Sequence, residues 1–129
     1  MYKMKEVCEQ TNMKYETLKF YCNEGLVPNL KRNEINYRIF DENDIAWIKG
    51  LIHLRRCGLS IKEMKYYMEL CVEGEITIKT RQDFLQIKQQ DLIKKQEELQ
   101  SCLDFIERKN KFYDDVLNGR IKYVSNIIR

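Results

Sequence analysis

Hydrophobic residues recur at helical spacing over most of the chain, which predicts a mainly α-helical protein. Two short amphipathic segments, residues 3–10 and 14–23, are separated by residues 11–13, and Gly25 and Pro28 end the second one. Two short helices around a turn of this size have the dimensions of a helix-turn-helix. A helical hairpin used only for packing has the same spacing, so spacing alone favours neither interpretation.

The pattern changes between residues 29 and 40. Residues 29–36 are polar and include two basic side chains, and residues 37–40 then alternate large side chains as a strand does. We therefore predict a small two-stranded hairpin with a basic tip, which is the form of a wing.

Two longer helices are predicted after the hairpin. Asp41 is a plausible N-cap for the first, at residues 42–57, and Gly58 ends it. Ser60 and Glu63 have the spacing of a capping box, so the second helix begins there.

A seven-residue repeat marks the remaining part of the chain, beyond a connector at residues 71–80. The repeated large residues are Leu85, Leu92, Leu99, Ile106 and Tyr113, and the half-polar companion row includes Leu103. Such a row is typical of a coiled-coil seam, here on a helix of residues 81–117. Because a head of residues 1–70 cannot cover so long an apolar face, we expect a homodimer, with either helix direction possible. Residues 118–129 are expected to form a short tail packed onto it.

Composition and charge narrow the class of protein further. With one proline and five glycines among 129 residues, the chain suits long helices and not a turn-rich β-sandwich. It has no apolar run long enough to cross a membrane and no amino-terminal signal, so we expect a cytoplasmic protein. A net charge of +3 is a weak argument for nucleic acid. Basic residues gather between positions 14 and 38, although an ordinary solvated surface would have the same composition.

No catalytic constellation is found. There is one histidine, no Ser-His-Asp arrangement and no glycine-rich phosphate loop, so we expect no enzyme activity. The five cysteines lack metal-site spacing, so we expect no metal or cofactor and predict that each cysteine fills space in the core. Two alternatives to a regulator stay open, a coiled-coil protein–protein adaptor and a thiol-based redox or electrophile sensor. The sensor would act through Cys57, Cys71 or Cys102.

Four ordered blocks of sequence resemble the MerR family of transcription regulators, in particular its small members without a separate effector-binding domain. The blocks are residues 17–21, 24–28, 37–45 and 54–63. The resemblance implies a winged helix-turn-helix head on an antiparallel coiled-coil homodimer. It also implies a DNA-binding transcription regulator that binds a pseudo-palindromic promoter. In response to a signal, the dimer would distort the operator so that RNA polymerase can use the promoter.

The resemblance also implies which residues contact DNA. These are Lys14, Tyr15, Thr17 and Lys19 on the recognition helix, Tyr21 at a phosphate, and Arg32, Tyr37 and Arg38 on the wing. The sequence departs from the family pattern at several of these positions and beside them. Lysine stands at position 19 where the family usually has arginine, and Asn36 stands where it has glycine before the wing tyrosine. No cysteine lies near Asn118, so a mercury, copper or zinc sensor is not expected.

Overall fold

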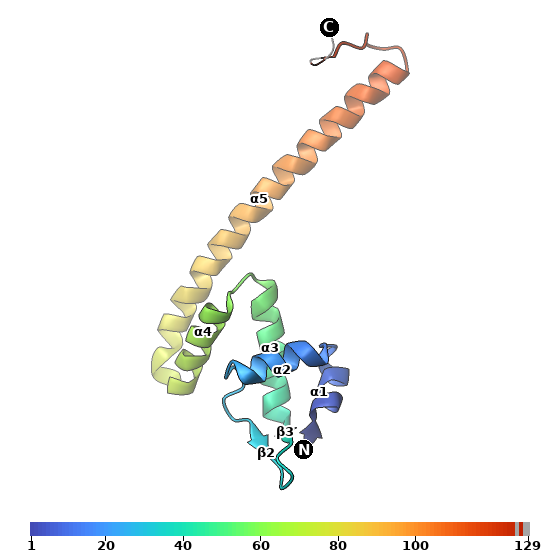
Figure 1. The fold of residues 1–129 in the computed structure, drawn as a ribbon. Helices are drawn as coiled ribbons and strands as arrows, with labels where there is room; N and C mark the ends of the chain where they lie inside the picture. Colours follow the sequence, from blue (N-terminus) through green and yellow to red (C-terminus); the bar gives the residue numbers. More distant parts are fainter. Residues whose placement is uncertain (126, 128–129) are drawn as a thin grey trace. The chain divides into compact units, whose positions relative to one another are not determined.

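The computed structural model describes residues 1–125 and 127, so three positions of the expected tail (126, 128 and 129) lie outside the described residues (Figure 1). The elements in chain order are β1 (Tyr2–Lys3), α1 (Met4–Thr11), α2 (Tyr15–Asn23), β2 (Lys31–Arg32), β3 (Arg38–Phe40), α3 (Glu42–Arg56), α4 (Ile61–Glu73), the 3-10 helix η1 (Glu75–Thr77) and α5 (Ile78–Leu117). Met1–Gln86 and Ile87–Arg129 form separate compact units. The predicted mainly α fold, a helix-turn-helix head followed by a long helix, is confirmed.

The head, Met1–Gln86, has two adjoining hydrophobic clusters. One is made by α1, α2, β3 and α3 and includes Val7, Leu18 and Phe40, none of which is exposed to solvent. The other includes Leu51 of α3 and Met64 of α4, also fully buried. Because each short helix contributes a side chain to a shared core, the helices fix one another's orientation, which none of them could do alone.

The wing contains one strand more than the sequence predicted. The sheet order is β1-β3-β2, and both pairs are antiparallel. Strand β3 therefore lies between β2, its partner in the predicted hairpin, and β1 at the amino terminus. The predicted helix of residues 3–10 accordingly begins at Met4, and the hydroxyl of Tyr2 donates a hydrogen bond to Glu42 at the start of α3. A two-residue strand is too short to show alternation, which is why the pattern missed it.

The predicted caps of α3 and α4 are confirmed. The Asp41 carboxylate accepts from the backbone N–H of Asp44 at 2.8 Å, and the Asp44 carboxylate accepts from the N–H of Asp41 at 2.9 Å. The Ser60 hydroxyl accepts from the Glu63 N–H at 3.1 Å in the same manner. Helix α3 ends at Arg56, one position before the predicted end, and Gly58 follows with a φ of 89°. These reciprocal bonds satisfy N–H groups that helix starts otherwise leave unpaired.

The connector before the long helix is shorter than the predicted residues 71–80. Helix α4 continues to Glu73, and α5 begins at Ile78 and not at residue 81. The reason is Thr77, which is 5% exposed and whose hydroxyl donates to the Leu70 carbonyl at 2.5 Å. This bond makes the connector a packed turn, which composition alone does not reveal. Among the described residues, no helix combines the length and apolar character needed to cross a lipid bilayer.

Candidate nucleic-acid interface

Helices α1 and α2 form the helix-turn-helix. Asn12 in the turn adopts a left-handed conformation, with φ of 57° and ψ of 31°, which asparagine tolerates better than most residues. Lys14 then occupies the N-cap of α2 in an extended conformation without a side-chain capping bond. Its exposed ammonium is therefore left for contacts outside the helix.

Helix α2 has distinct inner and outer faces. Tyr15 is 52% exposed and Lys19 is also exposed, whereas Leu18 is fully buried. Thr17 lies between these extremes. The spacing of large buried residues thus fixes one face in the core and directs the predicted base-reading side chains outward.

Tyr21 lies on the inner face of α2. Its ring packs with Leu26 and Leu51 and is 5% exposed, and burial raises the pKa of its hydroxyl. The hydroxyl therefore stays protonated and able to donate at neutral pH. Its predicted bond to a phosphate stays a prediction, and the packing of the ring shows a role in the core that the sequence pattern did not assign.

The start of α1, the start of α2 and the wing enclose an open cavity of about 360 Å³. It brings together four of the predicted DNA-binding residues and leaves Lys14, Thr17, Lys19 and Tyr21 outside. Its lining residues are Lys3, Met4, Lys5, Tyr15, Arg32, Asn36, Tyr37 and Arg38. Lys3 and Lys5 were missed because their approach to the wing depends on the pairing of β1 with β3. We call this cavity the wing cleft.

The wing cleft is electrostatically one-sided, with four cationic and no acidic residues among its described lining residues. The Arg32 guanidinium donates to the Asn36 carbonyl at 2.9 Å, and Arg38 donates through Nη2 to the Asn23 amide oxygen at 2.5 Å. The Nε of Arg38 is buried and has no hydrogen-bond partner among the described residues. A phosphate oxygen is the acceptor that suits such a donor. Neighbouring Lys31, in contrast, is already paired with Asp41 at 3.1 Å.

The tip of the wing is shaped by two asparagines. The Asn33 amide oxygen accepts from the backbone N–H groups of Ile35 and Tyr37, at 3.2 Å and 2.9 Å. Asn36 has a φ of 66°, so the residue that replaces the usual glycine holds the left-handed conformation glycine would have adopted. This turn positions Tyr37 and Arg38 on the cleft.

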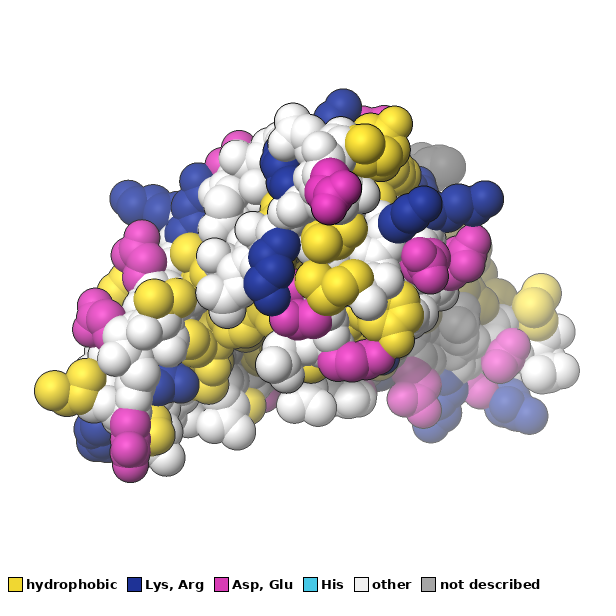
Figure 2. Space-filling view, turned by 90° about the horizontal axis from the view of Figure 1, so that it is seen from below, with side chains coloured by type: hydrophobic (Ala, Val, Ile, Leu, Met, Phe, Trp, Pro, Cys, Tyr) yellow, Lys and Arg dark blue, Asp and Glu magenta, His cyan; other side chains and the backbone are white. Residues whose placement is uncertain are grey.

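Charge elsewhere does not define a second basic surface in the view of Figure 2, where basic and acidic side chains are interspersed. This agrees with a net charge of only +3. The local clustering at the wing cleft, and not the total charge, therefore carries the electrostatic argument for DNA.

Helix α5 carries the predicted seam, and none of its residues is buried. The seam residues and their exposed fractions are Leu85 38%, Leu92 38%, Leu99 66%, Leu103 60%, Ile106 54% and Tyr113 48%. A continuous row of this kind is unusual on a monomer, because burying each large apolar side chain is worth about 1.5–3 kcal/mol.

The cysteines follow the core prediction only in part. Cys8, Cys22 and Cys71 are half-buried, and burial raises the pKa of the Cys8 and Cys22 thiols. Cys57 and Cys102 are exposed, so the prediction that these two cysteines fill space in the core is wrong. The prediction rested on how often cysteine is buried in proteins, and that tendency does not tell which side of a helix a given position occupies. Within the described part of the chain, no group of three or more histidine, cysteine or carboxylate side chains is arranged to hold a metal ion.

Comparisons with known proteins agree with this geometry. The family model described as MerR HTH family regulatory protein matches residues 2–71. An uncharacterized HTH-type transcriptional regulator of Haemophilus influenzae is 32% identical over 112 residues, which is 87% of this chain and 83% of that protein.

Two solved structures extend the likeness to the long helix. A protein assigned to the MerR family from Listeria monocytogenes has a TM-score of 0.82 and 32% identity, covering 93% of this chain and 91% of its own. The structure of HiNmlR, a MerR family regulator lacking the sensor domain, bound to promoter DNA, has a TM-score of 0.77 and 31% identity, covering 91% of this chain and 93% of its own. All three proteins are named as transcription regulators or as members of a family of them. The chain therefore belongs to the MerR family of helix-turn-helix regulatory proteins and is a DNA-binding transcription regulator.

Proposed function

We propose that the protein binds a pseudo-palindromic promoter as a homodimer, with one head on each half-site, and controls transcription by distorting the operator in response to a signal. RNA polymerase at the same promoter is the second macromolecular partner. Because bacterial promoters and their polymerase lie in the cytoplasm, we place the protein there. The observation that carries the proposal is the wing cleft, where four cations gather beside the helix-turn-helix with no acidic side chain among the described lining residues.

In this proposal the wing and α2 have different tasks. Arg32, Tyr37 and Arg38 hold phosphates, and Lys3 and Lys5 join them from the start of the chain. Phosphate contacts fix position and orientation, whereas base edges in the major groove carry sequence information.

The base-reading set is on α2. We assign it to Lys14, Tyr15, Thr17 and Lys19, with Tyr21 reaching a phosphate through its hydroxyl. Lysine at position 19 is a point charge and lacks the two-pronged donor geometry of arginine. We therefore expect Lys19 to tolerate more base combinations than the family's usual arginine would.

The homodimer is supported by the exposed seam of α5. With the bounds corrected to those of the structure, we assign DNA binding to the part of the chain up to the end of α4 at Glu73, the connector to residues 74–77, dimerisation to α5 (Ile78–Leu117) and the tail to residues 118–129. Two such helices in an antiparallel coiled coil would cover each other's apolar rows and remove them from water. A coiled-coil adaptor or a thiol sensor is not favoured, because the relatives found are transcription regulators.

Selection of duplexes from a random DNA library with the full chain tests the DNA-binding part. We expect enriched sites to contain two inverted half-sites, and affinity to fall steeply with salt. Arg32→Ala should weaken binding to every enriched site by a similar factor, whereas Lys94→Ala on the exposed surface of α5 should not. Enrichment of single, unpaired half-sites would contradict the proposal.

Sedimentation equilibrium tests the dimer. Leu99→Lys places a charge in the seam, and we expect it to weaken self-association by at least about tenfold, because an unpaired charge is costly in an apolar interface. Ser101→Lys adds the same charge about 160° away around the helix and serves as the control. A monomeric parent protein at micromolar concentration, or equal effects of the two substitutions, would contradict the coiled-coil assignment.

A further inference from the structure

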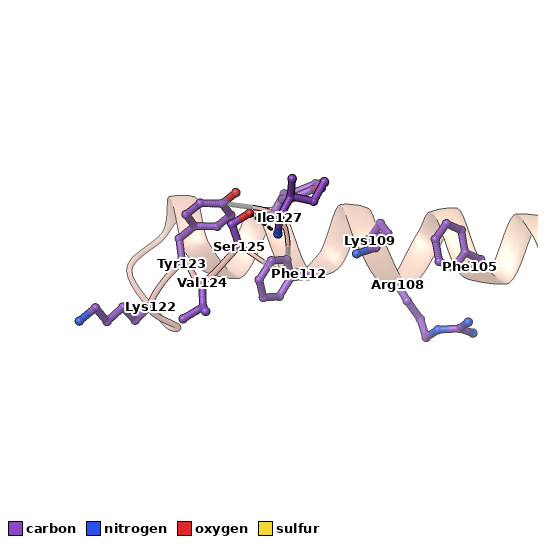
Figure 3. Close-up of a pocket in the computed structure, with 10 residues that line it drawn as sticks. Phe105, Arg108, Lys109, Phe112, Lys122, Tyr123, Val124, Ser125 and Ile127 are labelled. Carbon is purple, nitrogen blue, oxygen red and sulfur yellow. Dashed lines mark hydrogen bonds between the residues drawn. The ribbon is translucent and has the colours of Figure 1, made fainter. Parts of the chain in front are cut away.

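A second cavity lies entirely within the unit Ile87–Arg129, away from the residues assigned to DNA. Its volume is about 710 Å³, and it lies between the last turns of α5 and the segment that follows (Figure 3). Cavities of about 300–1,000 Å³ are typical of small-molecule sites. Six lining residues carry the argument: Phe105, Arg108, Lys109, Phe112, Tyr113 and Tyr123.

The cavity exists because the chain turns back sharply where α5 ends. Gly119, with a φ of 71°, allows the turn, and the Arg120 N–H donates to the Asp115 carbonyl at 2.8 Å. The Arg120 guanidinium also pairs with the Asp115 carboxylate at 2.9 Å. The following segment therefore runs beside the helix, and Figure 3 shows Tyr123 on this segment and Phe112 on the helix. A backbone hydrogen bond and an ion pair between Arg120 and Asp115 thus hold the start of the returning segment against the end of α5.

The lining combines flat apolar surface with positive charge. The four rings present faces and edges on which an aromatic group can stack. Arg108 and Lys109 supply positive charge from the helix, and Lys122, which also lines the cavity, supplies a third positive charge from the returning segment. The described lining residues include no carboxylate to balance these charges. The Lys109 ammonium lies 5.9 Å from the centre of the Phe105 ring, so a positive charge and an aromatic ring are already in cation–π contact in the lining.

From this combination we propose that the cavity binds a small aromatic anion, such as a carboxylate or sulfonate on a fused or substituted ring. The rings contact the apolar part of the ligand, and the cationic side chains bind its acid group. Polar groups at a few points in a mostly aromatic pocket fix the orientation of a ligand in this manner.

The cavity also lies largely outside the face that the proposed dimer would cover. At about 100° per residue, Phe105, Arg108 and Phe112 point about 100–160° away from Ile106 of the seam. Tyr113 is the seam residue among the six. A partner helix on the seam would therefore leave most of the cavity open to solvent, and ligand binding does not rest on the proposed contacts with DNA.

Titration of the full-length protein with 2-naphthoate, without DNA, tests the proposal. We expect one naphthoate per chain by calorimetry, and shifts of amide resonances in two-dimensional NMR confined to residues 105–127. The neutral analogue 2-naphthalenemethanol has the same rings without the charge, and we expect it to bind about tenfold more weakly because it lacks the charge-assisted bonds.

Variants separate the charge from the rings. Arg108→Gln combined with Lys109→Gln and Lys122→Gln removes the three lining cations. This triple variant should lose the preference for naphthoate over the neutral analogue while leaving the helical circular dichroism signal unchanged. Lys111→Gln, an exposed position of α5 outside the lining, should keep that preference and is the control for charge. Tyr123→Ala should weaken both probes by a similar factor. Equal affinity of the parent protein for the two probes, or shifts spread along the seam or in the head, would overturn the proposal.

Discussion

Arg38→Ala should separate DNA binding from folding. In the free protein the guanidinium donates a hydrogen bond to Asn23, while its buried Nε has no partner among the described residues. The substitution therefore removes one bond and at the same time removes an unpaired buried donor. These effects oppose each other, and we expect the free energy of unfolding to change by less than about 1 kcal/mol.

The effect on DNA binding should be much larger. A charged hydrogen bond to phosphate is worth about 1.5–3 kcal/mol, and a homodimer loses it twice. Even at the lower limit, about 3 kcal/mol in total corresponds to an affinity loss of roughly 150-fold. Each lost phosphate contact also lowers the steepness of the salt dependence by about 0.9, which gives about 1.8 for two heads.

Fluorescence anisotropy with a selected duplex, repeated over a series of salt concentrations, measures both quantities, and thermal unfolding measures the stability. Lys94→Ala removes one positive charge per chain from α5 and is the matched control. An Arg38→Ala protein with the parent's salt dependence would refute the phosphate contact, even if its affinity were lower. A large loss of stability would instead show that Arg38 acts through the fold.

Three further changes test local features of the head. Asn36→Ala should lower the free energy of unfolding by about 1 kcal/mol in chemical denaturation, because alanine is more strained than asparagine at a φ of 66°. Asn36→Gly should not lower it in this way, because glycine has no Cβ to be strained there. Met64→Ala should lower it by about 2–5 kcal/mol in the same assay, since its side chain is fully buried. The bond from the Asp44 N–H and the Lys31 ammonium lower the pKa of Asp41 from its ordinary value. The stabilising effect of Asp41 is therefore present at pH values above the ordinary pKa of an aspartate and is lost as the pH falls below it. Asp41→Asn should make acid unfolding less steep there, and an unchanged pH profile would contradict that role.

The parts of the fold that follow from local chemistry could be predicted from the sequence. The caps at Asp41 and Ser60 depend on residues three positions apart, and the seam of α5 depends on one repeated spacing. Strand β1 could not be predicted, because Tyr2 and Lys3 become a strand only when the distant β3 supplies their partners. The early start of α5 depends in the same way on the buried hydroxyl of Thr77.

The candidate site also combines residues that could be predicted from the sequence with residues that distant contacts bring to it. The family resemblance predicted DNA contacts by Arg32, Tyr37 and Arg38, and all three lie in the lining of the wing cleft. Lys3 and Lys5 join them only through the three-stranded sheet, so local sequence gave no reason to place them there. Asn36 shows that a departure from a family pattern can preserve geometry, since asparagine keeps the left-handed turn that the usual glycine provides.

The weak net charge and the exposed seam have a common consequence for how this regulator would recognise a promoter. A single head offers four cleft cations, and a contact of that size alone gives the modest, salt-sensitive affinity typical of non-specific binding. In the proposed homodimer, joining two heads through α5 would make the second contact intramolecular, so affinity for a paired site would rise by about 10²–10⁴ without any new contact. Unpaired half-sites gain nothing from this linkage. Discrimination would then depend on the spacing of half-sites as much as on base contacts, which fits a recognition helix with lysine and not arginine at position 19.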